Sequence, residues 1–236
     1  MPTPAQEKLI VALDFPAAAP ALEFIAHLDG ACHWFKVGLE LYLAAGNSVI
    51  DALRQRGHSV FLDLKFHDIP NTVAGAVRSA ASAGASLLTV HALGGPAMIE
   101  AAAGELTKLK TPPKLLAVTL LTSMDAQQMR SVGLMDASEA HVLQLAQMAR
   151  TAGADGVVAS PLETAALRKA LGSDALLVIP GIRSADDAAD DQRRTATPAA
   201  AIADGASMLV VGRPITRAAD PAAAARAILD QIASVS

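Results

Sequence analysis

Short apolar runs alternate regularly with Ala-rich segments of helical length along this chain. The apolar runs have the length of buried strands, and we predict eight, over residues 9–14, 34–38, 59–65, 86–91, 114–121, 156–160, 175–181 and 207–212. Helices are expected between them, for example over 17–28 and 141–153. Nearly continuous apolar runs are typical of parallel strands that are covered on both faces.

Glycine stands directly before the next strand at the end of several helical segments. Gly57, Gly84, Gly153 and Gly205 occupy such positions, which suit a left-handed helix C-cap. Eight strand–helix units in 236 residues favour an α/β fold, a single (β/α)8 or TIM barrel, for which about 250 residues is typical. A doubly wound open sheet is the alternative.

One long polar segment interrupts this regular pattern. It covers residues 184–198, between the seventh and eighth predicted strands. A connection of this length in a compact domain is either disordered or a functional lid. The chain has no Ser-, Gly- or Pro-rich linker, so we expect one domain over residues 1–236.

Composition narrows the class of protein. Hydrophobic residues make up 52% of the chain but aromatic residues only 3%, so Ala, Val, Leu and Ile must form the core. The formal net charge is −4 and no basic face stands out, so no nucleic-acid partner is expected. Cys32 is the only cysteine, which excludes an internal disulfide and indicates a structural thiol in a reducing cytoplasm. We expect neither a signal peptide nor a membrane span.

Charged residues gather where the first three predicted strands end. Asp14 ends the first strand, Lys36 lies in the second, and Asp63 and Lys65 end the third. Positions 63 and 65 are two apart, so their side chains are expected on the same face, with Leu62 and Leu64 facing the helices. The carboxyl ends of barrel strands carry the active site in enzymes of this fold.

Asp68 follows in the loop and completes an array with Lys36, Asp63 and Lys65 whose charges sum to zero. Alternating charges can leave water without an orphan charge, and each lysine keeps its proton because carboxylates flank it. A structural salt-bridge cluster is the alternative interpretation.

A second group of residues is suited to an anionic ligand. Gly212, Arg213 and Pro214 follow the eighth predicted strand, and Arg183 follows the seventh. Glycine lets a ligand approach the backbone, proline suits a first helical turn, and barrels often bind phosphate after these strands. His67 and His91 also lie near strand ends, but no metal-binding spacing accompanies them, so packing or hydrogen bonding is favoured over catalysis.

The stretch FLDLKFHDIPNT (61–72) brings these features together. In order around it stand VALDF, FKVGLEL, LTVHALGG, AVTLLTSM, IPGIR, DQRR and VGRPIT, which together cover nearly the whole chain. With these motifs the sequence resembles the orotidine 5′-phosphate decarboxylase family. Two departures, Ser184 in place of proline and Ala189–Asp190 where glycine is frequent, lie in the long loop and bear on its closure.

The resemblance implies an enzyme that decarboxylates orotidine 5′-phosphate to uridine 5′-phosphate without metal or cofactor. Lys36, Asp63, Lys65 and Asp68 resemble the family's charged tetrad, with Lys65 protonating the C6 carbanion. The resemblance further implies a homodimer in which Asp68 and Thr72 reach the partner's site. The remaining implied contacts are Asp14 and Lys36 with the ribose, Thr122 and Ser123 with the pyrimidine, and Arg183, Gln192, Gly212 and Arg213 with the phosphate.

Two rival hypotheses remain, a related enzyme and, from another class, a protein that only binds a ligand. A 3-keto-L-gulonate 6-phosphate decarboxylase-like enzyme would share the barrel and the D-x-K-x-x-D stretch but use magnesium. A non-catalytic phosphate-binding barrel would have no use for Lys65 between two carboxylates.

Overall fold

Eight parallel strands close into a barrel in sequence order, and β8 pairs with β1. The computed structural model describes residues 2–134, 139–183 and 195–235. The closed barrel confirms the predicted (β/α)8 fold and rules out the doubly wound sheet. The strands are β1 (Leu9–Ala12), β2 (Trp34–Gly38), β3 (Ser59–Phe66), β4 (Leu87–His91), β5 (Lys114–Val118), β6 (Gly156–Val158), β7 (Leu176–Ile179) and β8 (Met208–Val211).

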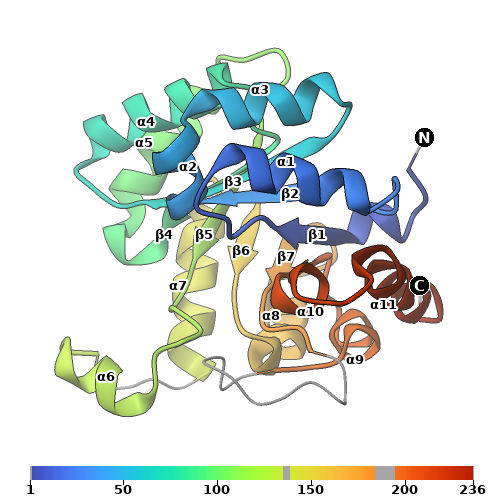
Figure 1. Ribbon diagram of the computed structural model, residues 1–236. Coiled ribbons are helices and arrows are strands. Elements are labelled where there is room, and N and C mark those ends of the chain that lie inside the picture. Colours follow the sequence, from blue (N-terminus) through green and yellow to red (C-terminus); the bar gives the residue numbers. More distant parts are fainter. Residues whose placement is uncertain (1, 135–138, 184–194, 236) are drawn as a thin grey trace.

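Helices surround the barrel (Figure 1). They are α1 (Ala18–His27), α2 (Leu39–Ala45), α3 (Asn47–Gln55), α4 (Pro70–Ser82), α5 (Gly95–Leu106), α6 (Ala126–Ser131), α7 (Glu139–Thr151), α8 (Thr164–Leu171), α9 (Pro198–Ala203), α10 (Arg213–Thr216) and α11 (Pro221–Ala233). Short 3-10 turns are η1 (Gln6–Lys8), η2 (Ala92–Gly94) and η3 (Pro161–Glu163). Within the described residues, none of these helices is both long and apolar enough to cross a membrane.

Each of the eight predicted strands is present, but most are shorter at the carboxyl end than the apolar run that predicted them. The run 114–121 is an example, because β5 ends at Val118 while Leu120 and Leu121 go on to line a cavity. Apolar residues beyond the strand ends therefore serve as cavity wall. The predicted C-cap glycines all adopt positive φ, between 81° at Gly57 and 99° at Gly205.

The core has two layers that follow from the alternation of side chains along each strand. Residues such as Ile10, Phe61 and Val178 fill the inside of the barrel. Their neighbours, such as Val11 and Leu62, pack between the barrel and the helices. Small alanines on the helices let them approach the strands closely, which explains a sizeable core with few aromatic residues.

The long segment after β7 begins and ends close together in space. Ile182 and Ala196 form an isolated parallel bridge, and the Arg183 N–H donates to the Ala196 carbonyl at 3.0 Å. The predicted irregular segment is one residue too long, since Pro198 already begins α9 and Thr197 caps it. Residues 184–194, including Ser184, Ala189 and Gln192, lie outside the described residues.

Candidate active site

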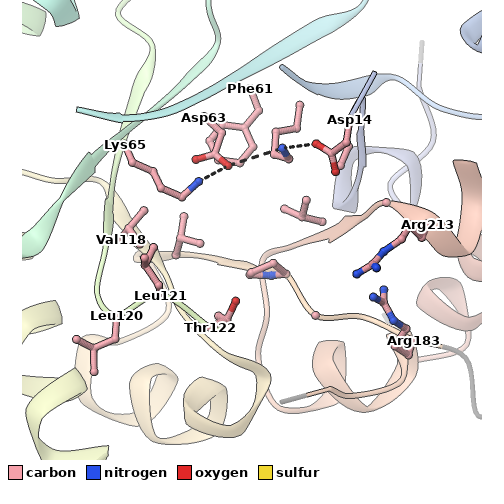
Figure 2. A pocket seen from close by; sticks show the side chains of 17 residues that line it. Asp14, Phe61, Asp63, Lys65, Val118, Leu120, Leu121, Thr122, Arg183 and Arg213 are labelled. Carbon is pink, nitrogen blue, oxygen red and sulfur yellow. Dashed lines mark hydrogen bonds and ion pairs between the residues drawn. The ribbon is translucent and has the colours of Figure 1, made fainter. Parts of the chain in front are cut away.

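A cavity of about 230 Å³ opens at the carboxyl ends of the strands. Figure 2 shows it with Asp63, Lys65 and Asp14 above, Arg183 and Arg213 to the right, and Val118, Leu120 and Leu121 at the lower left. It is lined by Ala12, Asp14, Lys36, Phe61, Asp63, Lys65, Val118, Leu120, Leu121, Thr122, Val158, Pro180, Gly181, Arg183, Val210, Gly212 and Arg213. Most of the predicted site residues are thus brought together, although they come from six different strand ends.

The end of β3 is irregular where it carries its charged residues. Its register against β4 shifts between Leu62 and Phe66, and Lys65 has a φ of +50°. A non-glycine residue in this left-handed region costs about 1–3 kcal/mol and persists where surrounding contacts hold it. The predicted geometry is nevertheless present: Asp63 and Lys65 both line the cavity, and Leu62 and Leu64 pack toward the helices.

Four charged side chains form a continuous alternating chain across the cavity (Figure 2). Lys36 Nζ lies 3.1 Å from Asp14 Oδ1 and 3.9 Å from Asp63 Oδ2. Lys65 Nζ lies 2.9 Å from the same Asp63 oxygen. Asp63 is buried, so it is a fixed anion between two ammonium groups, as a preorganised electrostatic site requires.

Gly38 provides the space for Lys36. A Cβ at this position would lie 3.0 Å from Lys36 Nζ and 3.8 Å from Asp14 Oδ1. Any larger residue would therefore require the ammonium group to shift by a few tenths of an ångström, because this contact is shorter than ordinary van der Waals contact. The sequence motif FKVG contains this glycine, but its role emerges only from the position of the lysine head group.

Two guanidinium groups stand at the opposite end of the cavity from Lys65 (Figure 2). Arg183 follows β7, and Arg213 begins the short helix α10, which Gly212 precedes as N-cap. The cavity thus carries four cationic and two anionic side chains, a net charge of plus two. Such a charge balance favours an anionic ligand over a free cation.

The apolar part of the cavity comes from the inner barrel and from the segment after β5. Phe61, Val118 and Leu121 contribute to it, and Thr122 adds a single hydroxyl. Ser123, predicted beside Thr122, is exposed and does not line the cavity. A flat, partly apolar ring with a polar edge would fit this wall.

Asp68 and Thr72 are not part of the cavity of their own chain. Both are exposed at the protein surface, and Asp68 accepts a hydrogen bond from the Ile69 N–H. The zero-charge array within one chain therefore includes Asp14 in place of Asp68. The spacing in the sequence could not reveal this, because Asp14 lies 49 positions before Asp63.

The two histidines near the strand ends stack on each other, with ring centroids 5.2 Å apart. His91 is buried and its Nδ1 accepts from the Leu93 N–H at 3.3 Å. The pKa of His91 is lowered to about 4, chiefly by burial and also by the positive charges of His67 and Lys65. Cys32 is a buried free thiol whose pKa burial raises to about 12, which makes it unreactive.

Sequence reasoning missed one buried polar residue beside the site. Thr89 of β4 donates its hydroxyl hydrogen bond to Asp63 Oδ1 at 3.0 Å and is fully buried. A threonine in an apolar strand gives no sign of such a role. The only hint in the sequence was that Thr89 lies two residues before His91 in the LTVHALGG motif.

Metal ligands are not grouped in the part of the chain that the structure describes: no three His, Cys, Asp or Glu side chains there are placed to hold an ion. A closed parallel barrel with a charged cavity at its strand ends, two arginines among the lining residues, defines the class: a TIM-barrel protein with a candidate active-site cavity whose charge suits an anionic ligand.

Comparison with known protein sequences and structures identifies the family within this class. The profile of the orotidine 5′-phosphate decarboxylase / HUMPS family matches residues 7–228. The orotidine 5′-phosphate decarboxylases of Halorhodospira halophila and Chromobacterium violaceum are 52% and 53% identical, over 99% and 95% of this chain and 99% and 91% of theirs. A crystal structure of the Lactobacillus acidophilus orotidine 5′-phosphate decarboxylase has a TM-score of 0.85 and 43% identity, covering 96% of this chain and 99% of that one. The chain therefore belongs to the orotidine 5′-phosphate decarboxylase / HUMPS family, which confirms the resemblance drawn from its motifs.

Proposed function

We propose that this protein decarboxylates orotidine 5′-phosphate to uridine 5′-phosphate in pyrimidine biosynthesis, without metal or cofactor. The observation that carries the proposal is the Lys65–Asp63 ion pair of 2.9 Å inside a cavity whose far end holds two arginines. One end can stabilise a carbanion and the other can bind a phosphate. Family membership and full-length relatives of about 50% identity support the same reaction.

The charges of the cavity suggest how the substrate lies in it. The phosphate faces Arg183 and Arg213 near Gly212, with Gln192 joining from the long loop as the resemblance implies. The ribose hydroxyls meet Asp14 and Lys36, which lie between the two ends. The pyrimidine then rests on the apolar wall with Thr122 at its edge. This orientation directs C6 of the ring toward Lys65.

The reaction breaks the bond between C6 and its carboxylate. The bonding electron pair stays on C6 while carbon dioxide leaves, and the Lys65 ammonium donates a proton to C6, after which the neutral amine regains a proton from solvent. A fixed ammonium near C6 stabilises the developing negative charge without reorganisation. Asp63 beside the leaving carboxylate adds repulsion that departure of carbon dioxide relieves.

Independence from metal is supported by the charge of the cavity. Two ammonium and two guanidinium groups outnumber its two carboxylates, and both carboxylates already pair with lysines. A divalent cation at these carboxylates would be repelled by the ammonium groups that already lie beside them. The magnesium-using rival therefore requires a different arrangement of the same residues.

We further propose a cytoplasmic homodimer in which Asp68 and Thr72 complete the partner's site. Both residues are exposed and lie near Ile69, an apolar residue that is 67% exposed. Leu39 and Leu43, on the helix after β2, are also exposed large apolar residues. Exposed apolar side chains in the segments that follow β2 and β3, at the carboxyl end of the barrel, suit a buried interface between subunits.

The direct test is the loss of orotidine 5′-phosphate absorbance in the presence of the purified protein, before and after exhaustive chelation. We expect full activity after chelation. Activity that disappears and returns with magnesium would favour the rival enzyme.

Lys65→Ala should abolish turnover in a folded protein. Lys108→Ala is the control: it removes an exposed lysine paired with Glu105 and should leave turnover unchanged.

Mixed dimers test the shared site. Lys65→Ala and Asp68→Ala chains, each inactive alone, should form heterodimers with one intact site, so random assembly restores roughly a quarter of wild-type sites. Lys65→Ala mixed with Asp63→Asn is the matched control and should restore none, because both residues line one chain's cavity. Heterodimers verified by mass that remain inactive in the first mixture would show that Asp68 serves its own chain.

A further inference from the structure

Thr89 makes two hydrogen bonds that connect β4 to both charged residues of β3. Its hydroxyl donates to Asp63 Oδ1 at 3.0 Å and accepts from the Lys65 backbone N–H at 2.9 Å. The side chain is fully buried and does not line the cavity. Thr89 can therefore act on the reaction only through Asp63 and Lys65.

The register of the sheet explains why a side chain takes this place. Leu62 pairs with Leu88 and Phe66 pairs with Val90, so three residues of β3 face Thr89 alone on β4. Between these two pairs, β3 has two residues more than β4. Side chains alternate with a period of two, so this insertion changes no face, and Asp63 and Lys65 remain directed into the barrel. The irregularity interrupts the ladder of hydrogen bonds between the two backbones. The Lys65 N–H instead donates to the Thr89 hydroxyl.

We infer that Thr89 is a positioning residue for the reaction, an inference that rests on the proposed function. It holds Lys65 in its left-handed conformation through the backbone, and it fixes Asp63 through one carboxylate oxygen. The other oxygen of Asp63 then faces Lys65 Nζ at 2.9 Å. The same hydroxyl thus aligns the proton donor and its anionic partner.

The direction of both bonds is fixed by chemistry. A carboxylate only accepts and a backbone N–H only donates, so the hydroxyl must donate to Asp63 and accept from Lys65. Threonine also has a restricted χ1 angle, which holds the hydroxyl in place. Valine has the same shape but can make neither bond, whereas serine can make both.

The test compares Thr89→Val and Thr89→Ser with wild type in steady-state decarboxylation. Losing one hydrogen bond to a charged group should lower kcat roughly 10- to 100-fold in Thr89→Val. KM should stay within about threefold, because phosphate and ribose contacts are untouched. Thr89→Ser should return kcat to within about threefold of wild type. Thr164→Val is the control: Thr164 is equally buried, but its hydroxyl donates to the Ser160 carbonyl, away from the charged residues of the cavity, so activity should not change.

A crystal structure of Thr89→Val gives a readout that does not depend on activity, and Thr89→Ala replaces it if the valine variant is insoluble. We expect Lys65 to leave its positive φ and Nζ to move beyond 4 Å from Asp63. Unchanged geometry, a wild-type kcat in Thr89→Val, or equal impairment of Thr89→Ser would each overturn the inference. A wild-type protein that leaves orotidine 5′-phosphate intact would instead refute the proposed function, while the crystal comparison would still decide the role of Thr89.

Discussion

Replacing Asp63 by asparagine removes the central anion of the alternating chain Asp14–Lys36–Asp63–Lys65. The change keeps the size of the side chain and an oxygen that can accept from Thr89. It leaves the ammonium groups of Lys36 and Lys65, which both faced one carboxylate oxygen, without that shared counter-charge. We expect both stability and turnover to fall.

The magnitude follows from the distances and the exposure. At an effective dielectric constant of about 20, unit charges at the observed separations of 2.9 Å and 3.9 Å attract by about 6 and about 4 kcal/mol. Desolvation offsets most of this attraction, and breaking a buried pair costs about 3–5 kcal/mol net. Water reaches Lys65, whose side chain is 33% exposed, so we expect the free energy of unfolding to fall by about 2–3 kcal/mol. Since the fixed charge also positions Lys65, kcat should fall at least about 100-fold.

Urea unfolding and steady-state decarboxylation measure the two effects. Asp155→Asn is the matched control, because it removes the same charge at the opposite end of the barrel, where Asp155 pairs with Lys114 and the Leu115 N–H. Its partner lysine is mostly exposed, so we expect a loss of about 1 kcal/mol and unchanged turnover. Equal stability losses in the two variants, or normal turnover in Asp63→Asn, would refute the coupling of these charges.

Three further predictions concern other parts of the site. Gly38→Ala adds a Cβ 3.0 Å from Lys36 Nζ and should lower kcat/KM about fivefold or more. Gly104→Ala is the control and should leave kcat/KM unchanged, because its Cβ meets nothing within 4 Å. Equal activities of the two variants would show that Lys36 adjusts without cost. Arg213→Ala should weaken binding of the substrate by about 2–3 kcal/mol but leave the phosphate-free nucleoside unaffected, and equal effects on both would mean that Arg213 does not bind the phosphate. Because the folded protein holds the pKa of His91 at about 4 and the unfolded chain has the ordinary value near 6.5, the unfolded state binds more protons between these values. Stability should therefore fall by about 3 kcal/mol as pH drops from 6.5 to 4, and urea titrations of His91→Asn should lack this loss.

The sequence by itself determined eight strand–helix units, favoured a barrel over a doubly wound open sheet, and indicated where charged residues gather. Eight apolar runs at even spacing specify eight buried strands, because only parallel strands covered on both faces are apolar throughout. Charged residues at the ends of such runs must lie at the carboxyl end of the barrel, which brings Asp14, Lys36, Asp63 and Lys65 to one cavity. The order of motifs further identified the family.

Only the tertiary structure decided which of these residues interact. The register shift between β3 and β4 sets Thr89 opposite Lys65, and no pattern in either strand encodes a shift that arises from their pairing. The space at Gly38 has meaning only once the Lys36 side chain crosses it. Asp68 follows the strand by two residues and yet lies outside the cavity, because the loop directs it to the surface. Sequence periodicity fixes the face of a strand on which a side chain lies, whereas contacts between strands depend on their register and on the loops, which periodicity does not specify.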